Sequence, residues 1–305
     1  MKKFAPLFIV IAAVLWGVDG IVLTPQLFSL PVPLVVFLLH ALAFILMLPM
    51  FIKELNEIRQ MKKGDWGAFI WIAIFGGAVG TMAIVKALFY VNFVNLSIVI
   101  LLQKLQPVFA ILLAWLILKE RLPKRFFLWT VLALSGSYLV TFGLNLPNLN
   151  TGEKTIAAAL FSLLAAFAFG SSTVFGKRGL QNVGYRVGTY LRFGLTSILM
   201  LLIVLTTGDL AQLGNVSSFQ WLIFLITALT TGGTAIFIYY WGLKRVTASV
   251  ATICELAFPL TAIILEYIIR GHALSWIQWL GAIILGYAIY RVSAINKEVI
   301  QKQSL

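Results

Sequence analysis

Ten apolar segments follow one another along almost the whole 305-residue chain, and they restrict its fold more than any motif does. Each is roughly 20 residues long, the length at which a helix crosses about 30 Å of hydrocarbon. Inside a bilayer only helices and closed barrels satisfy their own backbone hydrogen bonds. We therefore predict an all-α membrane protein with ten transmembrane helices. The segments lie at about 4–24, 33–52, 66–90, 95–118, 125–144, 155–176, 186–206, 218–242, 247–269 and 275–293.

The composition excludes an ordinary soluble domain, because 61% of the residues are hydrophobic and only 11% are charged, against about 25% charged in soluble proteins. The longest connections run to about a dozen residues, so any function must reside within the bilayer. The chain contains no GxxxxGK[ST], HExxH or GxSxG motif, and Cys254 is its single cysteine. We therefore expect neither an enzyme nor a bound cofactor or metal.

The basic residues explain the net charge of +13. If the N-terminus is cytoplasmic, all but five of the 23 Lys and Arg side chains fall on the cytoplasmic side. The exceptions are Lys154 and Arg270 outside, and Lys86, Lys104 and Arg192 within spans. By the positive-inside rule, we predict a multi-pass protein of a bacterial-type cytoplasmic (inner) membrane with both termini in the cytoplasm. The charge then reflects topology and not a nucleic-acid surface.

The chain also contains an internal repeat. An offset of 152 residues aligns 74–122 with 226–274 without a gap, and Gly80, Ser97 and Pro107 then match Gly232, Ser249 and Pro259. Because each repeat has five spans, an odd number, the second repeat enters the membrane from the opposite side. We predict a first five-helix repeat over 1–148, a second, inverted repeat over 149–295, and a cytoplasmic tail over 296–305. Such repeats are typical of secondary transporters.

The stretches 87–122 and 239–282 resemble the paired EamA domains of the drug/metabolite transporter superfamily. The most specific residues of this resemblance are Pro107 with Lys119-Glu120-Arg121-Leu122, and Pro259 with Leu274, Gln278 and Gly281. The second repeat departs from the pattern, since Gly271-His272 stand where the first repeat has Lys119-Glu120. The resemblance implies a ten-helix carrier with a central substrate cavity, which moves metabolites, amino acids or organic cations by alternating access.

Polar residues in the middle of spans four and nine are the main candidates for a substrate site. An ionisable side chain at this depth costs about 2.5–3.5 kcal/mol on insertion scales, so it usually faces a cavity or a partner. Gln103, with Lys104 on its flank, aligns with Glu255 in the other repeat. We expect Lys104 to bind an anionic group or to pair with Glu255. Pro107 and Pro259 interrupt both helices and are predicted hinges, although a static kink is the alternative.

Two charged residues lie nearer the outer side. Asp19, one turn from Trp16, either binds a cation or a proton or forms an ion pair with Lys86. Lys86 either contacts the substrate or reaches the membrane surface with its long side chain. Both residues, with Trp16, are candidates for the translocation path.

Four further residues each have two possible roles. His40 could titrate in the path, but a lone histidine is more often a packing residue. Tyr239 and Tyr240 either form an aromatic belt at the cytoplasmic interface or a wall that binds a cation. For Arg192, a structural role or a side chain that extends to the membrane surface is favoured over substrate binding.

The sequence thus predicts a secondary active transporter of a small molecule, embedded in the lipid bilayer as a monomer or homodimer. The opposite charges of Lys104 and Glu255 suit a zwitterion, so amino-acid export is the first expectation. An organic-cation, drug or quaternary-amine transporter is the alternative, and a non-transporting receptor or scaffold is the alternative of another class. If transport is coupled to protons, Glu255 or Asp19 would carry them.

Overall fold

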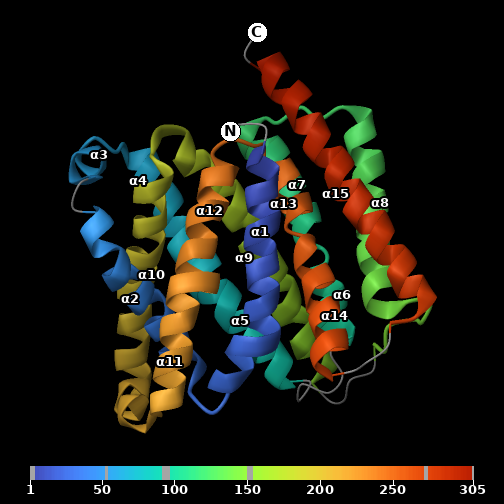
Figure 1. Cartoon of the computed structure of the whole chain (residues 1–305). Helices are drawn as coiled ribbons and strands as arrows, with labels where there is room; N and C mark the ends of the chain where they lie inside the picture. Colours follow the sequence, from blue (N-terminus) through green and yellow to red (C-terminus); the bar gives the residue numbers. More distant parts are fainter. Residues whose placement is uncertain (1–3, 52–53, 91–96, 150–153, 271–273, 304–305) are drawn as a thin grey trace.

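The computed structural model describes residues 4–51, 54–90, 97–149, 154–270 and 274–303. In this part of the chain, ten helical segments are long and apolar enough to cross a membrane. Each overlaps one of the ten predicted segments, and the all-α fold is confirmed. Both termini lie at the same end of the bundle, which we call the termini side (Figure 1).

Five spans are single helices: α2 (Val32–Phe51), α8 (Lys124–Phe142), α9 (Thr155–Asn182), α10 (Tyr185–Thr207) and α15 (Trp276–Gln303). The predicted tail therefore begins as a continuation of α15, which stays helical to Gln303. Shorter elements occupy two of the longer connections, namely α3 (Leu55–Arg59) and the 3-10 segment η6 (Asp209–Asn215).

The other five spans are interrupted. Span one comprises α1 (Ala5–Val18), the π-helical η2 (Asp19–Leu23) and η3 (Thr24–Leu27). Span three comprises α4 (Lys63–Trp71), the π-helical η5 (Ile72–Val79) and α5 (Gly80–Tyr90), and span four comprises α6 (Ser97–Gln103) and α7 (Gln106–Leu118). Span eight comprises α11 (Ser218–Thr227), the π-helical η7 (Ala228–Gly232) and α12 (Gly233–Leu243), and span nine comprises α13 (Ala248–Cys254) and α14 (Ala257–Arg270).

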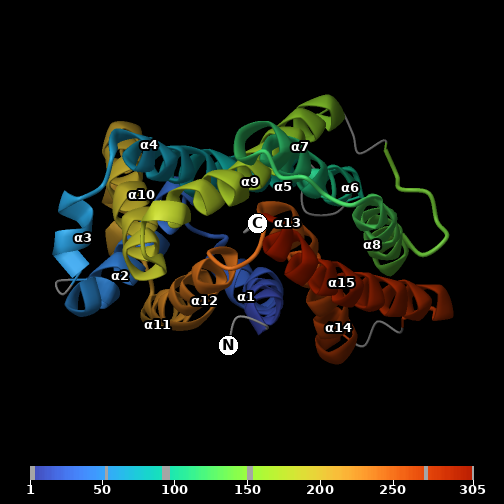
Figure 2. The same cartoon turned by 90° about the horizontal axis from the view of Figure 1, so that it is seen from above.

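The helices pack reciprocally between the two repeats. In the first repeat α2 packs on α10 of the second, and α8 packs on α15. Span one packs on spans eight and nine, while span six (α9) packs on spans three and four. A two-fold relation between the repeats produces this reciprocal packing. Figure 2 shows the α2–α10 and α8–α15 pairs at opposite flanks, with the remaining spans between them.

The α8–α15 pair has an unusually close crossing. A Cβ added to Gly136 would lie 2.8 Å from the backbone N of Leu285, and one added to Gly281 would lie 2.7 Å from the backbone N of Val140. Glycine at both positions therefore allows the two backbones to touch, as small residues do at many membrane helix interfaces.

Spans four and nine break at equivalent places. The turn Lys104–Leu105 separates α6 from α7, and the turn Glu255–Leu256 separates α13 from α14. Gln103 directly precedes the first turn and Glu255 begins the second, so the two breaks match to within one residue under the 152-residue offset. The π-helical segment η5 ends directly before Gly80 and η7 ends at Gly232, and the same offset aligns these two glycines. Such π-segments interrupt the regular hydrogen-bond ladder and often occur at functional sites.

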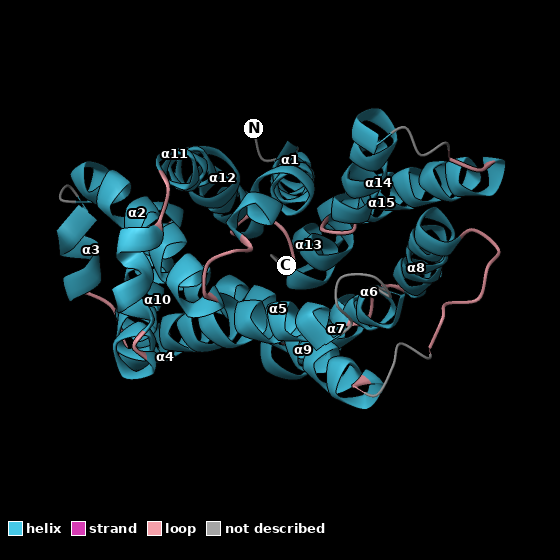
Figure 3. Cartoon of the chain, turned by 90° about the horizontal axis from the view of Figure 1, so that it is seen from below, coloured by secondary structure: helices cyan, strands magenta, loops and turns pink. Residues whose placement is uncertain are grey.

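The halves of spans four and nine on the termini side meet each other. There α7 packs on α13, and the buried carboxylate of Glu120 accepts hydrogen bonds from the backbone N–H groups of Ala248 (2.7 Å) and Ser249 (3.1 Å) and from the Ser249 hydroxyl (2.6 Å). At the opposite end, no packing of similar extent joins α6 to α14 among the described residues. Seen from below, α6 and α14 lie on separate sides of the bundle (Figure 3).

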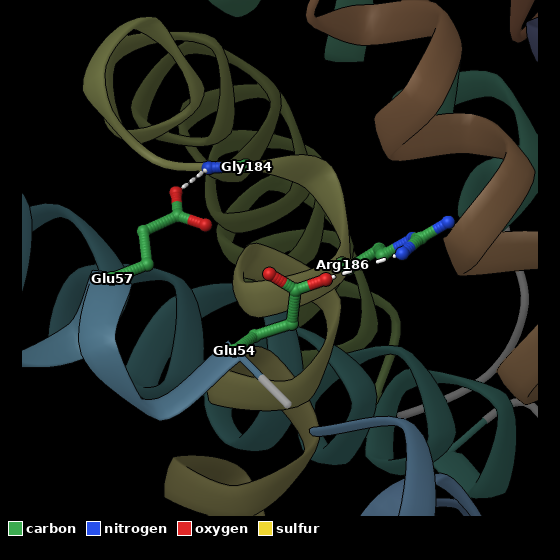
Figure 4. Close-up of polar contacts among 4 residues, drawn as sticks. All are labelled: Glu54, Glu57, Gly184 and Arg186. Carbon is green, nitrogen blue, oxygen red and sulfur yellow. Dashed lines mark hydrogen bonds and ion pairs between the residues drawn. The ribbon is translucent and has the colours of Figure 1, made fainter. Parts of the chain in front are cut away.

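The short helix α3 joins span two to the second repeat. Glu57 accepts a hydrogen bond from the backbone N–H of Gly184, just before α10, and Glu54 forms an ion pair with Arg186 at 3.2 Å (Figure 4). A carboxylate at the N-terminus of a helix is favourable because unpaired N–H groups point toward it. The contact fixes this connection on the termini side.

Candidate substrate site

Glu255 lies at the centre of a polar cluster built by four spans. Its Oε1 accepts hydrogen bonds from the hydroxyls of Tyr239 (2.6 Å) and Thr173 (3.2 Å), and its Oε2 accepts one from Nε2 of Gln106 (2.8 Å). These partners come from α12, α9 and α7, so both repeats contribute. Three hydrogen-bond donors thus converge on one carboxylate. The residue as a whole is half-buried, at the turn in the middle of span nine.

An aromatic wall adjoins this carboxylate. The ring of Tyr239 is 5.1 Å from that of Trp16, and the two are tilted by 55°. Trp16 is half-buried, and its indole N–H has no hydrogen-bond partner among the described residues. Tyr239 is only 3% exposed and Tyr240 only 1%, so the predicted interfacial belt is wrong for these tyrosines. They belong to the protein interior.

Arg192 is a second charged group within the bundle. Its guanidinium contacts the Ser172 hydroxyl and the Tyr240 hydroxyl, both at 3.5 Å, and the carbonyl of Gly76 at 3.4 Å. These contacts are long for hydrogen bonds to a cation, and the Nε atom is buried without a partner. The side chain therefore does not reach toward the membrane surface. It turns inward, near enough to Glu255 to interact with it electrostatically.

Asp19 joins the π-helical segments of spans one and eight. Its carboxylate accepts hydrogen bonds from Thr24 and from Thr231 of η7, both at 3.2 Å. The predicted ion pair with Lys86 is not formed; Lys86 is exposed and has no described partner. The structure thus separates these two candidates.

Gln103 and Lys104 both turn away from Glu255. Nε2 of Gln103 donates to the carbonyl of Ser162 at 2.9 Å, and Nζ of Lys104 donates to the Ser137 hydroxyl on α8 at 2.7 Å. The predicted Lys104–Glu255 ion pair is therefore wrong. The reason is the turn at Lys104–Leu105, which changes the helical phase, so that Gln106 faces Glu255 instead.

His40 and the two prolines have local roles in this structure. Nδ1 of His40 lies 2.8 Å from the carbonyl of Val36, and its ring is 5.5 Å from that of Phe193, which agrees with the packing interpretation. Pro107 lies in the first turn of α7 and Pro259 in the first turn of α14, directly after the breaks. Hinge motion at these prolines stays a prediction.

Three residues of the cluster were not among the predicted site residues. Gln106 was recognised on the polar side of span four but not as the partner of Glu255. Thr173 and Ser172 gave no signal, because hydroxyl residues are common in membrane helices and bond to their own backbone. Only the packing of α9 against both repeats brings them to the carboxylate and the guanidinium.

Comparisons with known proteins agree with this architecture. A sequence model of the EamA-like transporter family matches residues 3–142 and again residues 156–294. The chain is 49% identical over 291 residues to the riboflavin transporter ImpX of Fusobacterium nucleatum, which covers 95% of this chain and 97% of that protein. It is 27% identical over 304 residues to the uncharacterized transporter YwfM of Bacillus subtilis, covering 96% and 94%.

A solved crystal structure shares the fold, with a TM-score of 0.74 at 16% identity over 97% of this chain and 99% of the other. Two family matches, one over each predicted repeat region, together cover most of the sequence. The chain is a multi-pass membrane protein of the transporter class, and it belongs to the EamA-like transporter family.

Proposed function

We propose that this protein carries riboflavin, or a compound with the same ring system, across the cytoplasmic membrane. The observation that carries the proposal is the 49% identity with a riboflavin transporter over nearly the full length of both chains. The site is compatible with such a solute, because a hydrogen-bonding carboxylate lies beside the half-buried indole of Trp16 and the ring of Tyr239. A flat aromatic ring system can pack on such side chains.

The amino-acid export expected from the sequence is less well supported. A zwitterion needs a cation and an anion that face the same space, and Lys104 instead donates to Ser137 on α8. Riboflavin is neutral at pH 7 and needs no such pair of charges. Amino acids and organic cations remain the comparison substrates of the test below.

Alternating access is the mechanism that we propose. On the termini side, α7 packs on α13 and Glu120 joins the repeats, which supports a site that is closed at this end. Entry would occur between α6 and α14 at the other end. The opposite state would form when the two helix pairs exchange these roles, with bending at the breaks next to Pro107 and Pro259.

The orientation follows from the charges. The basic excess on the termini side favours a cytoplasmic position of both termini by the positive-inside rule, and in this proposal the closed end faces the cytoplasm. Because riboflavin carries no net charge, the membrane potential alone cannot concentrate it. Accumulation would require a coupled ion, for which the carboxylates of Glu255 and Asp19 are the candidate proton carriers.

Riboflavin flux into proteoliposomes tests the proposal. We expect purified protein to exchange labelled riboflavin across the vesicle membrane, and the same protein to rescue a bacterial strain that neither makes nor imports riboflavin. Glu255→Ala, checked for folding by its thermal unfolding, should lose both activities. Exchange of amino acids or quaternary amines without exchange of riboflavin would overturn the proposal.

A further inference from the structure

Glu255 retains one unused acceptor position. A carboxylate offers about four lone-pair sites. Oε1 uses two of them for Tyr239 and Thr173, whereas Oε2 receives a single hydrogen bond, from Gln106. Among the described contacts, Oε2 therefore keeps a lone pair for one further N–H or O–H of a bound molecule.

Gln106 has a free donor next to that acceptor. Its Nε2 carries two hydrogens, and among the described residues only Glu255 accepts one of them. The amide cannot be turned the other way, because its oxygen would then face the carboxylate oxygen. Like Glu255, Gln106 is half-buried. An acceptor and a donor thus stand side by side, 2.8 Å apart.

This acceptor–donor pair matches one kind of chemical group. A cyclic amide or imide presents an N–H beside a carbonyl on one edge, and it would form two parallel hydrogen bonds with Oε2 of Glu255 and Nε2 of Gln106. A phosphate or carboxylate would be repelled by Glu255. An ammonium group would use the acceptor but would leave the Gln106 donor unmatched.

We infer that the Glu255–Gln106 pair binds the imide edge of the flavin ring, where N3–H lies between two carbonyls, with the ring directed toward Trp16. The inference rests on the proposed riboflavin transport and adds the part of the substrate that determines specificity. A site built to hydrogen-bond a polar group discriminates strongly against an analogue that lacks it, because its own polar groups are then left unpaired.

Competition against riboflavin uptake by the wild-type protein tests the inference without any mutation. N3-methylriboflavin lacks the imide N–H, and we expect it to compete at least tenfold more weakly than unlabelled riboflavin. An analogue with a dimethylamino group in place of the 8-methyl group is changed at the far end of the ring and retains the imide. It should compete within a few-fold of riboflavin.

A substitution then identifies the residue. Gln106→Leu should weaken the binding of riboflavin more than that of N3-methylriboflavin. The inhibition constant of N3-methylriboflavin divided by that of riboflavin should therefore fall toward one. Gln212→Leu, on the exposed segment η6, is the matched control and should keep the wild-type ratio. A loss of fold would lower all uptake but would not change this ratio selectively.

The outcomes separate the two proposals. If riboflavin is transported and N3-methylriboflavin competes equally well, the imide inference is overturned and the proposed function stands. An unchanged ratio in Gln106→Leu would also overturn it. If the protein transports no riboflavin, the proposed function fails and the inference fails with it.

Discussion

Tyr239 contacts the candidate site in two ways, because its hydroxyl donates to Glu255 at 2.6 Å and its ring packs on Trp16. Tyr239→Phe keeps the ring and removes the hydrogen bond, and a hydrogen bond to a charged group is worth about 1.5–3 kcal/mol. We expect the KM for riboflavin to rise about tenfold, with little change in the thermal unfolding midpoint. Uptake kinetics and a thermal melt check both parts; wild-type KM in the variant would contradict the role of the hydroxyl.

Asp19 is the second carboxylate of the proposed path. Asp19→Asn removes the charge but leaves an amide oxygen that Thr24 and Thr231 can still bond. If Asp19 carries the coupled proton, uptake driven by a pH gradient should be lost, whereas exchange of riboflavin between the two sides should persist. Measurements with and without an imposed gradient distinguish the two modes. Equal loss of gradient-driven uptake and of riboflavin exchange would show that Asp19 is needed for binding or folding instead.

At the residue scale, the sequence pointed to Glu255, Tyr239 and Trp16, which lie together in the candidate site, but not to the hydroxyl and amide partners of the carboxylate. Glu255 could be identified because an ionisable group in a span is costly and therefore informative. Lys104 was misassigned, since residues were placed around a continuous helix and the turn at Lys104–Leu105 changes the phase. The threonine and serine partners carry no such cost, so only the packing of α9 reveals them.

The approach of α9 to the break in span four gives a prediction at the element scale. A Cβ on Gly170 would lie 2.8 Å from the carbonyl oxygen of Gln106 and 3.1 Å from the backbone N of Ala110. Gly170→Ala must therefore displace the start of α7. We expect at least a several-fold fall in riboflavin affinity, although no polar group is removed.

Gly286→Ala on α15 is the matched control, because a Cβ there meets nothing within 4 Å. Inhibition constants for riboflavin should be unchanged in this variant. Equal constants in Gly170→Ala and Gly286→Ala would show that the close approach of α9 does not position Gln106.

The contact between Glu120 and α13 also belongs to this scale. Glu120→Gln replaces a charged acceptor of two backbone N–H groups by a neutral amide. We expect the N-terminus of α13 to open more often, and the amides of Ala248 and Ser249 to exchange hydrogen for deuterium faster than in the wild type. Exchange in α8 serves as the internal reference. Unchanged protection at both amides would contradict a closing role for Glu120.

The elements differ in how far the sequence could predict them. The ten spans follow from length and hydropathy alone, and the prolines marked spans four and nine as interrupted. The π-helical segments η2, η5 and η7 could not be predicted, because their shifted hydrogen bonds depend on the packing of neighbouring spans. The helix α3 was also missed, since its Glu54 and Glu57 contacts join it to a distant part of the chain.

At the scale of the whole molecule, the reciprocal packing of the repeats suits the proposed alternation between two states of similar architecture. Ala114 of α7 and Ala248 of α13 belong to one buried cluster on the termini side. We expect a cysteine pair at these positions, in a Cys254→Ser background, to hold the carrier in one state when cross-linked by a short bifunctional reagent. Riboflavin exchange should then stop. Each single-cysteine variant, treated in the same way, should remain active.

Continued exchange in the cross-linked protein would show that α7 and α13 need not separate during transport.

The family and the ten-span arrangement at this scale could be predicted from the sequence. The substrate could not, because it depends on which side chains meet across the breaks.

The Glu120 contact has no counterpart in the sequence of the second repeat, where Gly271-His272 occupy the matching position. In the proposed cycle, we therefore expect the two end states to differ in energy, although the helices that form them are related by symmetry. An empty carrier should spend most of its time with its binding groups presented to the surroundings of the cell. For the proposed uptake of riboflavin, this bias favours capture at low external concentration, because the site is open to the outside before the substrate arrives.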